Sequence, residues 1–295
     1  MIRSGGQADG RSVDRRGFLG AASAFLLGGL RASLPDRLSA CPPLAVPSRP
    51  PTLGIQLYTL RDLLKDDFEG TLAALSRIGY QEVEFAGLYG RTAGEVRKVL
   101  DRNRLKAPSG HYGIPAITDT LDQTIAEAKT LGHRYVVVAW LPEEVRNPDG
   151  YARTAETFNQ AGQRLRQTGL TLGYHNHWFE FDALDGGRCG YDILLEHTRP
   201  ELVVMELDLY WIRKGGRDAL SYFADYPGRF RMVHVKDMAA DGAMVDVGRG
   251  AMDWPTLLQA AKRAGVEHRF VEHDEAKDPL AFARASFEFL ERLKV

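Results

Sequence analysis

Residues 202–236 read LVVMELDLYWIRKGGRDALSYFADYPGRFRMVHVK, and the assignment of the fold starts from them. The runs 202–208 and 231–236 are apolar and rich in β-branched residues, which is typical of buried strands. Between them, residues 218–226 have the spacing of an amphipathic helix. A strand, a helix and a second strand in this order indicate a parallel β-α-β unit.

The same alternation continues in both directions along the chain. We expect strands at 53–58, 82–86, 106–110, 135–139, 170–175, 202–208, 231–236 and 268–272. We expect helices at 68–78, 93–103, 121–131, 151–167, 191–198, 218–226, 255–264 and 279–293. Eight strand–helix units in about 245 residues predict an α/β fold, a single (β/α)8 TIM barrel over residues 52–295. A doubly wound open sheet is the alternative, but no glycine-rich phosphate loop follows the first strand.

The first fifty residues differ from the rest in composition. Arg15 and Arg16 precede an uncharged run of apolar and small residues at 17–30, which is the pattern of a twin-arginine (Tat) signal peptide. We therefore expect a signal peptide at 1–40, a proline-rich linker at 41–51, and a periplasmic or otherwise extracytoplasmic protein. Residues 38–41, LSAC, resemble a lipobox, so membrane attachment is expected only if Cys41 is lipidated.

Composition and charge exclude several classes of protein. Apolar residues make up 44% of the chain and charged residues 26%, which is a globular balance and not that of a disordered or fibrous chain. Residues 1–50 hold seven Arg and three Asp, so the net charge of -1 leaves -5 for residues 51–295. An acidic body is a poor match for nucleic acid, which we exclude as a partner.

The predicted strand ends, where a TIM barrel carries its chemistry, are rich in titratable side chains. Five of the eight histidines fall there, namely His111, His175, His177, His234 and His273. The other three, His133, His197 and His268, are expected to be structural. Because residues two apart in a strand share a face, the pairs His175/His177, Glu206/Asp208 and His234/Lys236 are expected to point into the barrel. Buried charges need partners or a cation, and mixed imidazole and carboxylate ligands suit Mn, Zn, Co or Fe.

Four motifs at these strand ends resemble the xylose isomerase-like TIM barrels, the sugar phosphate isomerase/epimerase superfamily. They are YHNH at 174–177, LDLYW at 207–211, HVKD at 234–237 and VEHD at 271–274. In that superfamily a divalent metal is held by an acid on strand five, Asp on strand six, His on strand seven and Glu on strand eight. The resemblance therefore implies Asp208, His234 and Glu272 as ligands of a divalent ion such as Mn, Zn, Co or Mg.

Strand five departs from the superfamily pattern, because this chain has His175 where many relatives have Glu. Either His175 is the fourth ligand, or Glu180 or Glu84 reaches the ion instead. Inosose dehydratases are similar to this chain in having a histidine cluster at this strand.

The resemblance also implies the reaction, which is abstraction of a proton beside a carbonyl group with an enediolate stabilised by the metal. His177 is the expected general base, Glu180 is the second candidate, and Lys236 is expected to neutralise or protonate an oxyanion. The residues expected to bind substrate are Tyr58, Glu84, His111, Trp140, Trp178, Trp211 and Asp274. Aromatic faces suit the C–H face of a sugar, although each tryptophan could equally be packed beneath a loop.

Two outcomes follow from one enediolate. Reprotonation at a neighbouring atom gives isomerisation or epimerisation of a sugar, which is our leading interpretation. Loss of a β-substituent from a keto-sugar, an inosose or a 3-keto-glycoside makes the protein a dehydratase or lyase, which is the alternative. A metal-bearing, sugar-binding barrel without turnover is the second alternative. In each case the expected partner is a small sugar or sugar derivative.

Overall fold

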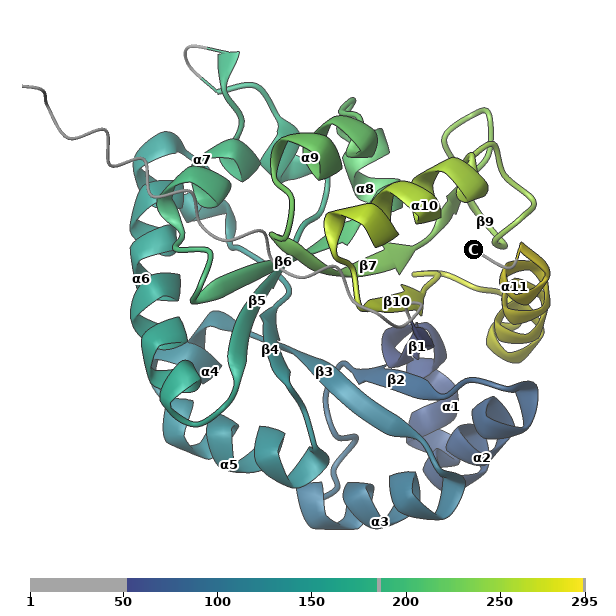
Figure 1. The fold of residues 1–295 in the computed structure, drawn as a ribbon. Coiled ribbons are helices and arrows are strands. Elements are labelled where there is room, and N and C mark those ends of the chain that lie inside the picture. Colours follow the sequence, from purple (N-terminus) through teal and green to yellow (C-terminus); the bar gives the residue numbers. More distant parts are fainter. Residues whose placement is uncertain (1–51, 185–186, 294–295) are drawn as a thin grey trace, which may run out of the picture. The chain divides into compact units, whose positions relative to one another are not determined.

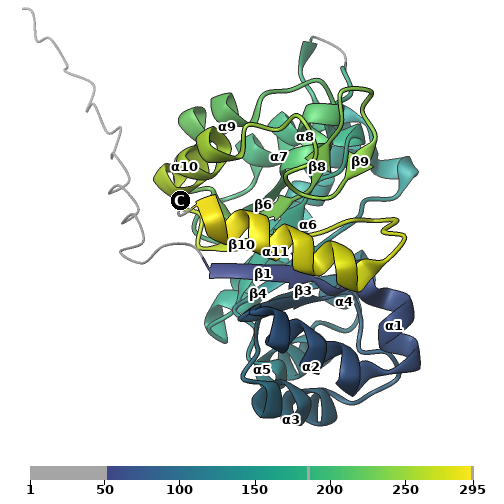
Figure 2. The ribbon, with the colours of Figure 1, turned by 90° about the vertical axis from the view of Figure 1, so that its right-hand side faces the viewer.

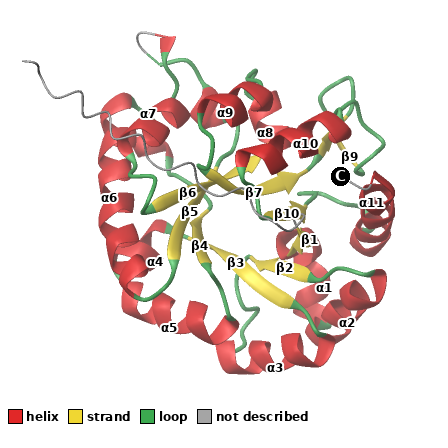
Figure 3. Ribbon diagram, viewed as in Figure 1, coloured by secondary structure: helices red, strands yellow, loops and turns green. Residues whose placement is uncertain are grey.

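Eight parallel strands form a closed barrel inside a ring of helices (Figures 1 and 3). The structure is a computed structural model that describes residues 52–184 and 187–293. The barrel strands are β1 (Thr52–Gln56), β2 (Glu82–Phe85), β3 (Lys106–Tyr112), β4 (Tyr135–Val138), β5 (Thr171–His175), β6 (Val203–Asp208), β7 (Phe230–Val235) and β10 (His268–Val271). Each strand pairs with the next, and β10 closes on β1. The predicted (β/α)8 barrel is confirmed, while the predicted signal peptide and linker lie outside the described residues.

Eight helices cover the barrel at the places where the sequence predicts them. They are α2 (Phe68–Ile78), α3 (Ala93–Asn103), α5 (Leu121–Leu131), α6 (Pro148–Gln167), α7 (Gly190–His197), α9 (Ala219–Asp225), α10 (Trp254–Ala264) and α11 (Pro279–Leu293). The last helix, α11, packs beside α2, so the helical layer closes where the strands do (Figure 2). No helix of the described part has both the length and the apolar content needed to cross a bilayer.

Several short elements are not apparent in the sequence, and all of them follow a barrel strand. They are η1 (Leu57–Leu60), α1 (Arg61–Asp66), α4 (Ile114–Thr118), η2 (Glu143–Val145), η3 (Phe179–Phe181), α8 (Leu209–Lys214) and the hairpin of β8 (Asp237–Met238) with β9 (Met244–Val245). Segments this short show no complete helical period, so hydrophobic spacing cannot reveal them. They form the loops at the carboxyl end of the barrel.

Glycine ends some of the predicted helices for a steric reason. Gly79 follows α2 with φ +123°, and Gly265 follows α10 with φ +99°. These left-handed conformations are strained for residues with a Cβ atom. A Cβ on Gly79 would also lie 2.5 Å from the ring of Phe287 in α11, so a side chain here would disturb the contact between α2 and α11.

Strand alternation divides the buried residues into two cores. Outward side chains such as Val203, Met205 and Leu207 of β6 belong to the main core between strands and helices. A smaller core of Tyr135, Val137, Val204, Met232 and Phe270 fills the barrel interior. On β6 the next inward positions after Val204 are Glu206 and Asp208. Polar side chains therefore lie above this smaller apolar core, toward the carboxyl ends of the strands.

The histidines expected to be structural lie away from that polar stack. His133 Nδ1 lies 2.6 Å from the carbonyl oxygen of Ala107, and burial lowers the pKa of His133 to about 4. His268 pairs with Glu82 at 2.7 Å, and His197 lies in the last turn of α7.

Candidate metal centre and substrate pocket

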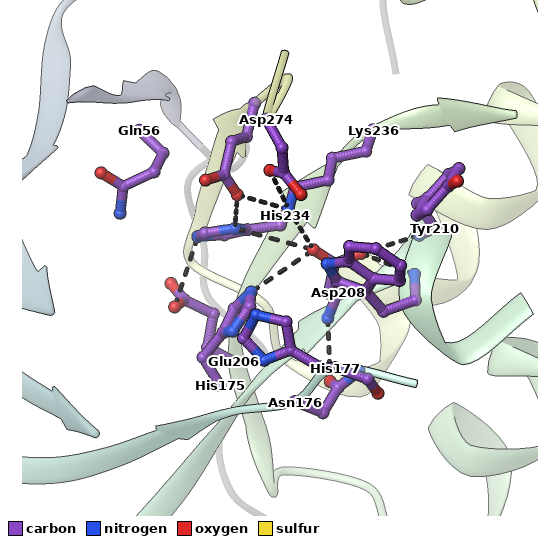
Figure 4. Close-up of polar contacts among 12 residues, drawn as sticks. Gln56, His175, Asn176, His177, Glu206, Asp208, Tyr210, His234, Lys236 and Asp274 are labelled. Atoms are coloured by element: carbon purple, nitrogen blue, oxygen red, sulfur yellow. Dashed lines mark hydrogen bonds and ion pairs between the residues drawn. The ribbon is translucent and has the colours of Figure 1, made fainter. Parts of the chain in front are cut away.

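Four buried side chains converge at the carboxyl ends of neighbouring strands (Figure 4). They are His175 at the end of β5, Asp208 at the end of β6, His234 in β7 and Glu272 after β10, and their ligand atoms all lie within 4.8 Å of one another. His175 Nε2 lies 3.3 Å from Asp208 Oδ2, and His234 Nδ1 lies 2.6 Å from Glu272 Oε2. The structure thus brings together the four residues predicted as metal ligands.

These residues fit a metal ion. Both ring nitrogens of His175 and Oδ2 of Asp208 are buried without a well-aligned hydrogen bond, and their contacts are the ion pairs of Asp208 Oδ2 with His175 and Lys236. Burial, reinforced by His234, lowers the pKa of His175 and favours the neutral imidazole that binds metals. Two imidazoles and two carboxylates form a donor set that suits a divalent transition metal.

Asp208 is oriented by the helix that follows it. Its Oδ1 accepts the backbone N–H groups of Tyr210 (2.9 Å) and Trp211 (2.8 Å), so Asp208 is the N-cap of α8. Its own N–H donates to Oδ1 of Asn176 at 3.0 Å. Capping holds one carboxylate oxygen, which leaves Oδ2 directed towards His175 and Lys236. The LDLYW motif therefore encodes a strand end, a helix cap and a ligand in one segment.

Lys236 is a buried cation beside the same carboxylates. Its Nζ lies 3.1 Å from Asp208 Oδ2, 2.8 Å from Glu272 Oε2 and 2.9 Å from Asp274 Oδ1. Burial alone would lower the pKa of Lys236, but these three carboxylates raise it well above its usual value. In return, although burial opposes it, Lys236 together with His175 lowers the pKa of Asp208 to about 2. The lysine is therefore charged at neutral pH and faces the centre.

A pocket of about 530 Å³ opens above the four residues. Its lining includes most of the predicted substrate-binding and catalytic residues, namely Tyr58, His111, Trp140, His177, Trp178, Trp211, Lys236 and Asp274. Tyr58, Trp140 and Trp178 are 43%, 45% and 39% exposed, and they are the large hydrophobic side chains that remain exposed in the described part of the chain. Aromatic rings that are open to solvent and face a polar centre suit a sugar with one apolar face.

His177 lies between the metal centre and the aromatic wall. Its ring centroid is 4.9 Å from that of His175 and 4.7 Å from that of Trp140, and it stacks on Phe179. Burial, followed by the charges of His175 and Lys236, lowers the pKa of His177 to about 2. The imidazole is therefore neutral, and a pKa this low makes it a weak base while its surroundings stay as they are here. His273, another histidine predicted at a strand end, is absent from the lining of this pocket and packs against Phe282.

The position of Glu180 does not support its predicted role as a second base. Its side chain is fully buried outside the pocket lining. One carboxylate oxygen accepts the Tyr174 hydroxyl, and the other accepts the His177 backbone N–H at 2.8 Å. Tyr174 faces outwards from β5 and packs on Phe158 of α6. Burial raises the pKa of Glu180 to about 7, but the group holds the turn after β5 and does not face substrate.

Glu84 also lies elsewhere than predicted. It is fully buried in β2 and is absent from the pocket lining, so it cannot touch a substrate there. Its Oε2 accepts from Gln56 Nε2 at 2.8 Å and lies 2.7 Å from His234 Nε2 and 3.2 Å from His111 Nε2. The Glu84 side chain points into the barrel below the pocket, at the level of His234 Nε2.

Three further residues around the site have structural roles that the sequence analysis did not assign. Asn176 joins β5 to β6, and Glu206 contacts His111 and His234. Asp237 accepts N–H groups of Gly248, Gly250 and Trp254 and so holds the loop between β7 and α10. The HNH, ELD and HVKD motifs contain these residues, but a motif alone does not identify their partners.

Comparison with known proteins agrees with this fold. Residues 72–293 match the family described as xylose isomerase-like TIM barrel. An inosose dehydratase from Lacticaseibacillus casei is 22% identical over 267 residues, covering 76% of this chain and 89% of the relative. A sugar phosphate isomerase/epimerase from Parabacteroides distasonis has a TM-score of 0.74 and 26% identity, covering 84% of this chain and 96% of that one. An L-ribulose 3-epimerase shares the fold, with a TM-score of 0.65, 18% identity and coverage of 82% and 94%.

The family match covers well over half of the chain, and the protein therefore belongs to the xylose isomerase-like TIM barrel family. This family places it among enzymes that include isomerases, epimerases and dehydratases.

Proposed function

We propose that the protein is a metal-dependent enzyme that removes a proton from the carbon beside a carbonyl group of a sugar or sugar derivative. Isomerisation or epimerisation is the leading outcome. One observation carries this proposal, namely the buried set His175, Asp208, His234 and Glu272 beneath a pocket with exposed aromatic rings. A bound ion would stabilise the negative charge that develops on the oxygens of an enediolate.

The residues of the pocket have distinct roles in this reaction. His177 lies between His175 and Trp140, and we assign it the removal of the proton from carbon on this position. Lys236 presents its ammonium group to an oxyanion, and Asp274 holds that group at 2.9 Å. Trp140 and Trp178 pack on the C–H face of the sugar and keep water away from the reacting carbon.

The pocket favours an unphosphorylated substrate. Lys236 is the one Lys or Arg among the residues that line it, and it already contacts three carboxylates. Apart from the proposed ion, a phosphate group would therefore find no cation that is free of carboxylate partners among the lining residues. Export through a twin-arginine signal at residues 1–40, which we propose on the sequence alone, agrees with a substrate taken outside the cytoplasm.

Dehydration is the second candidate, and the inosose dehydratases at 22% identity favour it. The same proton abstraction then leads to loss of a β-hydroxyl group. Lys236 lies where it could protonate the departing oxygen.

Solvent exchange tests the proposal and separates the outcomes. Metal-loaded protein is incubated in deuterated buffer with a panel of ketoses, inososes and 3-keto-glycosides, and the carbon-bound protons are followed by NMR. We expect deuterium next to the carbonyl of the true substrate, together with an isomerised, epimerised or dehydrated product. Chelator-treated protein serves as the control. Tight binding of a panel member without exchange would instead indicate a sugar-binding barrel without turnover.

A further inference from the structure

A second group of metal-ligating side chains lies one layer deeper in the barrel than the centre described above. Glu84 of β2, His111 of β3, Glu206 of β6 and His234 of β7 each direct one ligand atom to a common point, and these atoms all lie within 4.8 Å of one another. Glu206 precedes Asp208 by two residues, so both point inward from β6 at successive heights. The two groups share His234, whose Nδ1 faces the upper set and whose Nε2 faces the lower set.

The side chains of the deeper group are joined by hydrogen bonds and ion pairs whose lengths are close to the separation of ligand atoms around one ion. His111 Nε2 lies 2.8 Å from Glu206 Oε2 and 3.2 Å from Glu84 Oε2. His234 Nε2 lies 2.7 Å from Glu84 Oε2 and 3.3 Å from Glu206 Oε2 (Figure 4 shows the contact with Glu206). A tetrahedral site with metal–ligand bonds of about 2.0–2.1 Å places its ligands roughly 3.3 Å apart. A shift of a few tenths of an ångström per side chain would admit an ion.

Unpartnered atoms point to a missing cation. Glu84 and Glu206 are fully buried, and Oε1 of each has no hydrogen-bond partner. Both side chains are aimed into the cluster, because their Oε2 atoms meet His111 and His234 there. Lys236 pairs with three carboxylates of the upper layer instead. Two buried carboxylates at such close range require positive charge beside them, which protonated His111 and His234 supply here and which a bound cation would supply in their place.

We propose that Glu84, His111, Glu206 and His234 form a second site for a divalent transition-metal ion. The centre is then dinuclear, with the imidazole of His234 binding one ion through Nδ1 and the other through Nε2 after both ring protons have left. Two nitrogen and two oxygen donors select Zn²⁺, Co²⁺ or Mn²⁺ over Mg²⁺, which prefers oxygen ligands and water. The inference rests on the proposed function in one respect, because it assumes that His175, Asp208, His234 and Glu272 already hold one ion.

Metal counting tests this proposal on the full chain. The protein is stripped with a chelator, titrated with Zn²⁺ or Mg²⁺, desalted and measured by mass spectrometry of the metal. We expect two Zn²⁺ and no more than one Mg²⁺ per chain. His111→Ala and Glu206→Gln should each lower Zn²⁺ from two to one. Glu82→Gln is the matched control and should keep two, because Glu82 lies on β2 two residues before Glu84 but pairs with His268.

Several results would overturn the second site. Wild-type protein that saturates at one Zn²⁺ excludes it, as does retention of two ions by both folded variants. If the variants fail to fold by circular dichroism, anomalous scattering from zinc-grown crystals of the wild type decides the question. Two peaks on opposite sides of the His234 ring are expected, and a single peak contradicts the proposal. Exchange activity with one ion per chain would leave the proposed function intact while removing this inference alone.

Discussion

The side chain of Asn176 accepts the backbone N–H of Asp208 at 3.0 Å, and this bond joins the end of β5 to the end of β6. Asn176 stands between His175 and His177, and Asp208 caps α8 at the same time. The candidate ligands at the ends of β5 and β6 and the start of α8 are therefore held by one connected set of hydrogen bonds. Such outer contacts fix the direction of metal ligands.

Removal of this bond should weaken metal binding. Asn176→Ala leaves the Asp208 N–H without its partner, and we expect a metal affinity lower by about 10–100-fold, the usual effect of losing an outer-shell contact. Competition with a chelator measures the dissociation constant. Asn159→Ala is the control, because Asn159 likewise joins two segments, α6 and residues 197–199, but in the helical layer. Equal affinities for the two variants would contradict the prediction.

The group of His175, Asp208, His234 and Glu272, which we call the upper centre, can be tested one residue at a time. We expect Asp208→Asn, His234→Ala and Glu272→Ala each to lose metal and activity together. Asparagine at 208 can still cap α8, so that variant isolates the loss of the ligand charge. His268→Asn, at the other end of the barrel, should keep its metal. Native metal content in two of the three ligand variants would refute the assignment.

The two histidines after β5 should behave differently. His177→Ala should keep its metal and still bind substrate, with turnover lower by roughly 10²–10⁴-fold, as for loss of a general base. His175→Ala should lose metal, and His175→Glu should recover part of it, since a carboxylate is also a ligand for these divalent metals. Metal content and single-turnover rates separate the two roles. The reverse pattern would assign His177 to the metal.

Glu180 should make stability fall as the pH rises. Burial raises its pKa in the folded protein to about 7, against an ordinary value of 4.5. Between these pH values the folded state holds more protons than the unfolded state, so the free energy of unfolding decreases, by about 3 kcal/mol in total. The loss is complete above pH 7. Glu180→Gln has no carboxyl proton to release, so its free energy of unfolding should increase relative to that of the wild type as the pH rises across this range.

Chemical denaturation at a series of pH values measures that difference. Glu288→Gln, an exposed change in α11, should follow the wild-type curve. If the curve of Glu180→Gln also runs parallel to that of the wild type between pH 4.5 and pH 8, the carboxyl group is not protonated in the way that its burial implies.

The leader sequence gives a prediction outside the barrel. Replacing Arg15 and Arg16 by Lys should leave the protein in the cytoplasm, because the export receptor reads the arginine pair and not only its charge. Cell fractionation measures the distribution. Cys41→Ser should leave export and solubility unchanged, whereas membrane retention that depends on Cys41 would support the lipoprotein alternative. Normal export of the lysine variant would mean that residues 1–40 are not a twin-arginine signal.

The sequence alone determined the barrel, and together with the family resemblance it predicted the four residues that the structure brings together in the upper group. Each strand is a short run with its own periodicity, and the rule that chemistry lies at the carboxyl ends of parallel strands directs attention to a few positions. Asp208 and His234 could therefore be identified, with the family pattern, before any coordinates. The same reasoning placed Glu206 inside the barrel without identifying what it contacts.

Two features became apparent only in the tertiary structure. They are the depth at which Glu84 lies inside the barrel and the direction of Glu180, which faces away from the pocket. Adjacent strands are staggered, so that His175 pairs with Glu206 while Asp208 pairs with His234. The height of Glu84 relative to His234 is therefore a property of the closed barrel and not of either strand. Glu180 lies in η3, beyond the end of β5, where the two-residue alternation no longer applies. Its carboxyl group turned outwards because Tyr174 and the N–H of His177 offer it hydrogen bonds on that side.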